Sequence, residues 1–86
     1  MKRMTKKNGK EIYVCDEKKA LERLAQFEDF FFDLIQDQKE ISQQITMMQN
    51  EMRIKQYRYR EISAQKVTNS LILRKLKEYG ITEEAE

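Results

Sequence analysis

The clearest pattern in the chain lies between Leu24 and Met52, which reads LAQFEDFFFDLIQDQKEISQQITMMQNEM. Apolar residues recur here in steps of three and four, and an average step of about 3.5 residues is the period of a helix packed lengthwise against another helix. The pattern therefore predicts a long helix with one apolar face, which we call the seam. Its members are Leu24, Phe27, Phe31, Leu34, Gln38, Ile41, Ile45, Met48 and Met52.

Gln38 is the polar member of the seam, and its role has two interpretations. A polar residue inside a helical bundle can fix the register and the number of helices, at some cost in stability. The alternative is that the bundle is simply frayed or partly hydrated at this level. The sequence leaves both interpretations open.

Three consecutive phenylalanines, Phe30 to Phe32, spread aromatic rings over three sides of one helical turn. One partner helix covers only one stripe, so this level indicates a bundle with more than two helices. A chain of 86 residues reaches such a bundle most simply as a homo-oligomer, with a dimer as the simplest case. We expect the following side chains at the buried oligomer seam: Phe27, Phe31, Leu34, Ile41 and Ile45.

The residues on either side of the seam predict the other elements. Residues 1–15 form a β-hairpin, because Lys2–Lys7 and Lys10–Val14 flank Asn8-Gly9, a pair typical of a type I′ turn. Asp16 is an N-cap candidate, which gives a long helix over residues 16–50. The absence of proline and the presence of only two glycines fit a mainly α-helical single domain over residues 1–86.

A second, shorter antiparallel helix is predicted over residues 57–80, followed by a frayed tail over 81–86. Gly80 is the expected left-handed stop, with Ile81 folding back onto the last turn. The start of this region is ambiguous, because the alternation of Tyr57 and Tyr59 with Arg58 and Arg60 fits either a short strand or a helix start. Together the elements predict a coiled-coil-like helical bundle.

The net charge of +2 conceals a strong segregation of charge along the chain. Residues 1–10 carry five bases and no acid, residues 16–40 carry eight acids against four bases, and residues 53–77 carry eight bases against Glu61. One interpretation is that the acidic helix and the basic helix lie side by side and neutralise each other. The other is that the basic face is exposed and binds an acidic partner.

Residues suited to catalysis or metal binding are scarce. The chain has no histidine, a single cysteine (Cys15) and no glycine-rich phosphate loop. These features predict a protein that is not an enzyme and that uses no metal or cofactor. The lone thiol and the lack of a long apolar run predict a cytoplasmic protein without a membrane partner.

The best candidate for a partner-binding surface lies before and within the start of the second predicted helix. Basic side chains alternate there with tyrosines, and Tyr and Arg are the residues most enriched in protein–protein hot spots. The same combination also suits phosphate groups and stacked bases. The alternative is that the tyrosines belong to the core and the bases pair with acids of the first helix. The candidate residues are Arg53, Lys55, Tyr57, Arg58, Tyr59 and Arg60.

Two stretches resemble known sequences. Residues 20–29, ALERLAQFED, are similar to the opening LxxLAxYED of small accessory proteins of phages and prophages of Gram-positive bacteria. Residues 59–62, 66–69 and 73–81 are similar to a second run in such proteins. The resemblance implies a viral protein in the bacterial host cytoplasm, and by analogy one that binds and inhibits a host complex, as anti-CRISPR inhibitors of host defence do.

Two other functions fit the same sequence. A protein that binds nucleic acid or nucleotides would use the basic stretch 53–60, and its affinity would fall steeply with salt. The acidic helix and the small net charge argue against this role. A structural coiled-coil component of the virion would have no host partner and no salt-sensitive binding.

Overall fold

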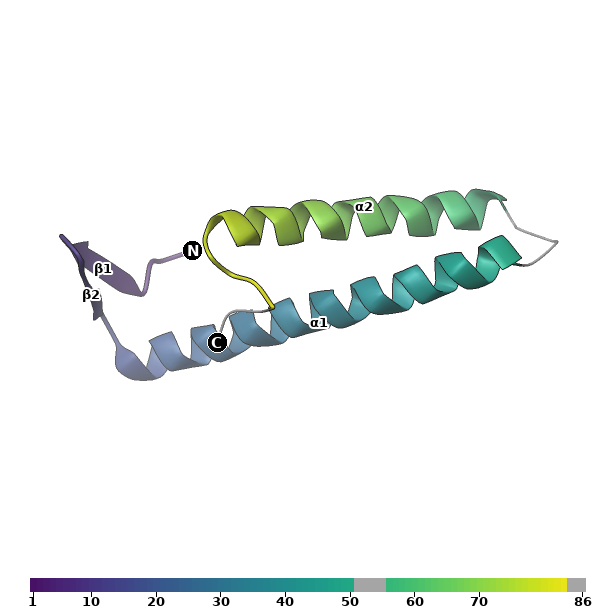
Figure 1. Cartoon of the computed structure of the whole chain (residues 1–86). Helices are drawn as coiled ribbons and strands as arrows, with labels where there is room; N and C mark the ends of the chain where they lie inside the picture. The colour runs from purple at the N-terminus through teal and green to yellow at the C-terminus, as the bar shows by residue number, and fades with distance from the viewer. Residues whose placement is uncertain (51–55, 84–86) are drawn as a thin grey trace. The chain divides into compact units, whose positions relative to one another are not determined.

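The computed structural model describes residues 1–50 and 56–83. Along the chain it places strands β1 (Thr5–Asn8) and β2 (Glu11–Val14), then helices α1 (Glu17–Asn50) and α2 (Gln56–Glu78) (Figure 1). The predicted fold class is confirmed: the chain is mainly helical, with an N-terminal antiparallel hairpin followed by two packed helices. No helix in the described part of the chain is long and apolar enough to cross a membrane.

The hairpin turn lies one residue further along the chain than the sequence predicts. Asn8 pairs with Glu11 at the end of the ladder, so the two-residue loop is Gly9–Lys10 rather than Asn8-Gly9. Gly9 has a φ of 65°, and no other residue of β1, the loop or β2 has a positive φ. A glycine at the first loop position is the requirement of a type II′ turn, whereas type I′ needs positive φ at both positions.

The long helix begins where the sequence predicts. The Asp16 side chain accepts a hydrogen bond from the backbone N–H of Lys19 at 3.1 Å, which is the N-cap arrangement. Glu17 places a negative charge in the first turn, where the helix dipole favours it. No glycine or proline interrupts the next turns, and α1 continues for 34 residues to Asn50.

Helix α2 ends in the predicted way, two residues before the predicted limit of 80. Gly80 has a φ of 83°, and its N–H donates to the carbonyl of Lys77 at 2.9 Å. The N–H of Ile81 donates to the carbonyl of Leu76 at 3.1 Å. These two bonds form a Schellman motif, which satisfies carbonyls that the helix end would leave free. Of the tail 81–86, the described residues are 81–83, where Ile81 and Thr82 are half-buried.

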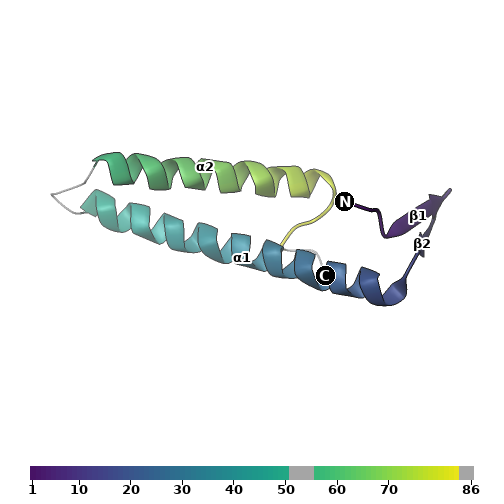
Figure 2. The same ribbon diagram turned by 180° about the vertical axis from the view of Figure 1, so that it is seen from behind.

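The chain divides into two compact units, Met1–Asp33 and Leu34–Glu86, and α1 runs through both. The first unit holds the hairpin and the start of α1, and the Arg23 guanidinium donates to the backbone carbonyl of Lys2 there. The single-domain interpretation stays a prediction. The second unit holds residues 34–50 of α1 and the whole of α2, which lie antiparallel and side by side (Figures 1 and 2).

The core of the second unit lies between its two helices. On α1, Leu34 and Ile41 are buried, and Gln38, Ile45 and Met48 are half-buried, as their spacing in the seam predicts. On α2, a stripe with the same steps of three and four is shielded from solvent, and we call it the inner stripe. It consists of Tyr59, Ile62, Lys66, Asn69, Leu73 and Leu76.

Candidate interaction site at the start of the second helix

The first two turns of α2 contain four of the six residues that the sequence marks for partner binding. The sequence left open whether this segment is a short strand or the start of a helix, and it is helical, because α2 begins at Gln56. A helical period sends neighbouring side chains in different directions, so Tyr57 to Arg60 do not form one continuous surface. Arg53 and Lys55 lie outside the described residues.

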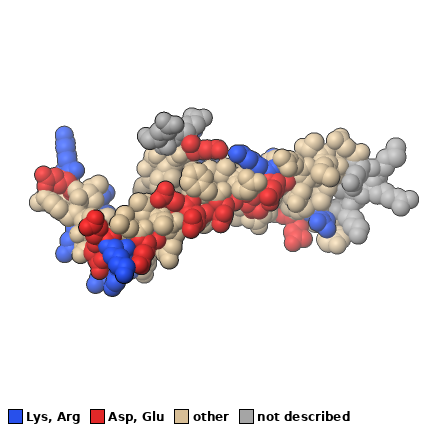
Figure 3. Space-filling view, turned by 90° about the horizontal axis from the view of Figure 1, so that it is seen from below, with Lys and Arg blue, Asp and Glu red and all other residues tan. Residues whose placement is uncertain are grey.

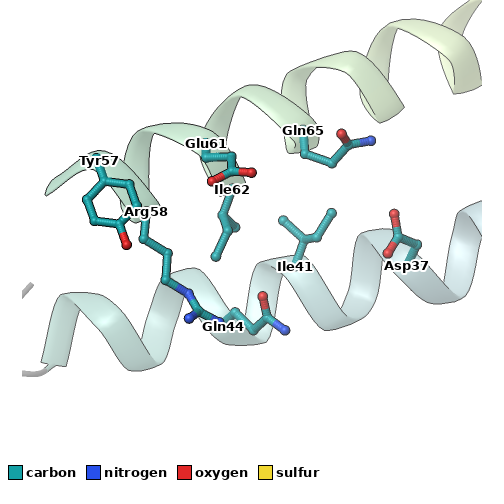
Figure 4. Close-up of a pocket in the computed structure, with 8 residues that line it drawn as sticks. All are labelled: Asp37, Ile41, Gln44, Tyr57, Arg58, Glu61, Ile62 and Gln65. Carbon is teal, nitrogen blue, oxygen red and sulfur yellow. The ribbon is translucent and has the colours of Figure 1, made fainter. Parts of the chain in front are cut away.

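A shallow hollow of about 400 Å³ opens between the two helices of the second unit (Figure 4). Tyr57 and Arg58 stand at its α2 side, and the Arg58 guanidinium extends toward Gln44 of α1. Tyr57 is 71% exposed. The floor is apolar and comes from Ile41 and Ile62, while the remaining lining residues are polar: Asp37, Glu61 and Gln65.

The other two predicted residues point elsewhere. Tyr59 belongs to the inner stripe and is half-buried, and its hydroxyl accepts a hydrogen bond from the Gln49 side-chain amide at 3.3 Å. Its side chain therefore holds the two helices together near their connection. Arg60 is exposed and lies away from the hollow. Tyr57 and Arg58 are thus the pair that the structure brings together.

Charge pairing between the helices does not account for the basic residues of α2. Within residues 1–50 and 56–83 the ion pairs are Lys39–Glu83 at 3.6 Å and Lys75–Glu78 at 3.1 Å, and neither joins a base of α2 to an acid of α1. Acidic side chains gather along α1 in the view from below (Figure 3). The acids of α1 and the bases of α2 other than Lys66 are exposed, so a partner can reach them.

A polar layer crosses the core of the second unit next to the hollow. Asn69 is 2% exposed, and its side-chain amide donates to a carboxylate oxygen of Asp37 at 2.9 Å and accepts from the amide of Gln65 at 2.9 Å. The Gln38 amide donates to the backbone carbonyl of Lys66 at 3.1 Å and to the hydroxyl of Ser70 at 2.7 Å. Gln38 is therefore packed and hydrogen-bonded rather than frayed.

The residues expected at an oligomer seam fall into both units. Leu34 and Ile41 are buried and Ile45 is half-buried in the second unit, while Phe31 is buried and Phe27 half-buried in the first. Within the second unit Leu34 and Ile41 are already buried, so a dimer built on this part of the seam would require the helical hairpin to open. The role of these residues in an oligomer stays a prediction.

The chemistry that the hollow offers is recognition. It presents two carboxylates, a guanidinium, a phenol and two carboxamides over an apolar floor. Such a set can hold charged and hydrogen-bonding groups of a ligand. Elsewhere, the Tyr13 hydroxyl donates to the Glu11 carboxylate, and this hydrogen bond raises the pKa of Tyr13 above its usual 10.0. Among the residues that the structure describes, no group of three or more His, Cys, Asp or Glu side chains is placed to hold a metal ion.

No family model, no curated protein and no solved structure matches this chain. The assignment of a function therefore depends on the residues of the site.

Several residues of the site were not expected from the sequence. Asp37, Gln44 and Gln65 line the hollow, but each reads as an ordinary solvated residue of a polar helix face. The signal that could have found them is the inner stripe of α2, because residues that flank two facing stripes line the grooves between the helices. That signal was hidden by Lys66 and Asn69, which are polar members of the stripe.

Proposed function

We propose that this chain is a non-enzymatic protein-binding hairpin that acts as a phage or prophage accessory protein in the bacterial cytoplasm. In this proposal it binds a host macromolecular complex and inhibits it, as a counter-defence inhibitor of the anti-CRISPR type does. The sequence resemblance of residues 20–29 and 59–81 supports the viral part of the proposal. The geometry of the hollow supports the binding part.

The observation that carries the proposal is the exposed pair of Tyr57 and Arg58 at the edge of the hollow. A tyrosine that is 71% exposed contributes little to the stability of the fold. At an interface the same ring supplies a large apolar surface with few rotamers to immobilise, and arginine supplies five hydrogen-bond donors. The hollow beside them gives a partner side chain an apolar floor between the Asp37 and Glu61 carboxylates.

A pull-down from a host lysate tests the proposal. We expect the wild-type chain to recover a host complex, and Tyr57→Ala and Arg58→Glu each to reduce recovery by about tenfold or more, as hot-spot substitutions do. Tyr79→Ala and Lys18→Glu are the matched controls, because Tyr79 is 76% exposed and Lys18 is an exposed base in the first turn of α1. Both controls should recover the complex as the wild type does.

Two results would contradict the proposal. The first is a wild-type chain that recovers no host protein, and the second is equal recovery by Tyr57→Ala, Arg58→Glu and their controls. Helical circular dichroism should be unchanged in all four variants, because none of the substituted side chains is buried. A loss of recovery therefore reports on binding rather than folding.

Nucleic-acid binding is a second candidate, favoured by the exposure of all five bases in residues 1–10. It predicts an affinity for DNA or RNA that falls at least tenfold between about 50 and 200 mM salt. A gel shift at both salt concentrations separates it from protein binding. An affinity that stays constant over this range would exclude phosphate contacts as its source.

A further inference from the structure

The face of α2 that points away from the core carries a second stripe, which we call the outer stripe. Its members follow one another in steps of four and three, like those of the inner stripe. At about 100° per residue the two stripes lie about 150° apart around the helix axis. The outer stripe consists of Arg60, Ala64, Val67, Leu71, Arg74 and Glu78.

The centre of the outer stripe is apolar and uncovered. Val67 is 59% exposed and Leu71 is 51% exposed, and Ala64 beside them is also exposed. One exposed leucine would need no explanation. Three apolar residues in helix-packing register, with a charged residue at each end, form the arrangement with which one helix packs on another.

We propose that the outer stripe binds the outer stripe of a second copy of this chain, with the two α2 helices antiparallel. The two-fold axis then passes at the level of Asn69, so that Val67 of each copy contacts Leu71 of the other. Val67 and Leu71 lie two residues before and two residues after Asn69. An antiparallel pairing centred there therefore places Val67 of one copy opposite Leu71 of the other. The contact is therefore the same from both sides, as a two-fold dimer requires.

The charges of the stripe select this arrangement. With the axis at residue 69, Arg60 of one copy lies opposite Glu78 of the other, and symmetry repeats this pair at the far end. Arg74 then lies opposite Ala64, a small residue over which its long side chain can pack. Glu78 is exposed and already meets Lys75 of its own helix at 3.1 Å, so it would stand between two bases.

Other arrangements of the same stripe bring like charges together. Parallel helices would place Arg60 opposite Arg60 and Arg74 opposite Arg74. An antiparallel pairing shifted by one turn toward the start of α2 would place Arg60 opposite Arg74. Like charges at a helix interface are unfavourable, so the sequence of the stripe distinguishes one pairing from its neighbours.

Sedimentation equilibrium on the full chain tests the proposal. We expect a reversible dimer with a dissociation constant of about 10–100 μM, because three apolar residues per copy form a small interface. Leu71→Lys should give a monomer over this range. Met47→Lys is the matched control, since Met47 is 63% exposed on α1 and lies outside the stripe, and it should leave the dimer intact.

A charge-reversal cycle tests the orientation. Arg60→Glu and Glu78→Arg should each weaken the dimer by about tenfold, because each turns two attractive contacts into repulsive ones. The double variant should recover the wild-type dissociation constant. Both single changes favour the helix itself, since an acid then lies nearer the start of α2 and a base near its end. A weakened dimer cannot therefore be attributed to unfolding.

Three results would overturn the proposal. One is a wild-type chain that stays monomeric up to about 1 mM, beyond the weakest specific association expected of such a stripe. Another is a dimer that Leu71→Lys leaves unchanged, which would place the contact on a different face. The third is a double variant that fails to restore the dimer, which would exclude the antiparallel pairing of Arg60 with Glu78.

Discussion

At the scale of single residues, Asn69 is the most deeply buried side chain that the structure describes. It is buried, and both ends of its carboxamide are bonded, one to Asp37 of α1 and the other to Gln65 of its own helix. A buried carboxamide costs free energy for each of its hydrogen bonds that is not made. The carbonyl oxygen of Gln38, also buried, has no partner within the described residues, so the layer already tolerates one unmade bond.

Substitution of Asn69 by alanine should lower the free energy of unfolding by about 1–2 kcal/mol. The change removes the bonds to Asp37 and Gln65 and leaves a small cavity. Thr68→Ala is the control, because Thr68 is exposed and its hydroxyl donates only to the carbonyl of Ala64 within the same helix. Urea denaturation monitored by circular dichroism measures the free energy of unfolding of both variants. Equal stability of the two variants would show that the polar layer has no net effect on folding.

The sequence reveals one side of this layer and conceals the other. Gln38 is visible because it interrupts an otherwise apolar run. Asn69 is not visible, because Lys66 and Asn69 both occupy the inner stripe while Val67 and Leu71 lie on the far face of α2. A search for apolar residues therefore finds candidates on both faces of this helix, and the structure shows which face is shielded.

At the scale of elements, the helix limits follow closely from local signals in the sequence. Asp16 and Gly80 were predicted from short-range chemistry, and each makes the backbone hydrogen bonds that the prediction implies. The turn of the hairpin was displaced by one residue, because Asn-Gly and Gly-Lys both permit a tight turn and the register depends on the strands as well. The limits of these helices depend on residues within one turn and could be predicted, whereas the hairpin register depends on the pairing of two strands and could not.

Replacement of Gly80 should show the cost of the left-handed residue that ends α2. Gly80→Ala should lower the free energy of unfolding by about 1 kcal/mol, because an L-residue resists positive φ. Beyond the adjacent residues, no atom of the described chain lies within 4 Å of the added Cβ position, so the effect comes from the backbone. Gly80→Asn should lower the free energy of unfolding by less than Gly80→Ala does, since asparagine tolerates positive φ better than alanine. Thermal melting of the three chains tests the order, and an alanine variant as stable as the wild type would contradict it.

At the scale of the whole molecule, part of the seam is buried by the chain itself. Leu34 and Ile41 are buried in the second unit, where α2 lies beside α1, so two helices of one chain suffice to cover this part of the seam. The sequence predicted this part of the seam correctly but not what covers it, whereas Leu24 at the start of the predicted seam is 53% exposed and Met52 at its end lies outside the described residues. The reason is physical: a heptad pattern indicates that a partner helix packs against the seam, but it does not indicate whether that helix belongs to the same chain or to another copy.

Folding of the single chain should therefore not depend on its concentration once the outer stripe is blocked. We expect Leu71→Lys to keep the wild-type helical content, with a melting temperature that is constant between about 1 and 100 μM, because mass action acts only on associating species. Circular dichroism at the two concentrations measures this. A midpoint that rises with concentration would instead indicate that copies share the seam, as in the dimer predicted from residues 27–45.

The polar layer also has a consequence for the speed at which the second unit forms. Two helices joined end to end make mostly local contacts, and such topologies fold within microseconds to milliseconds. Their hazard is that repetitive apolar stripes can also close seven residues out of step. In that state Asn69 would keep its bond to Gln65 of the same helix but would lose the Asp37 carboxylate, and Gln38 would lose its bonds to Lys66 and Ser70. Such a mispaired hairpin would lose about 1–3 kcal/mol per unmatched group, so it would reopen quickly instead of persisting as a kinetic trap.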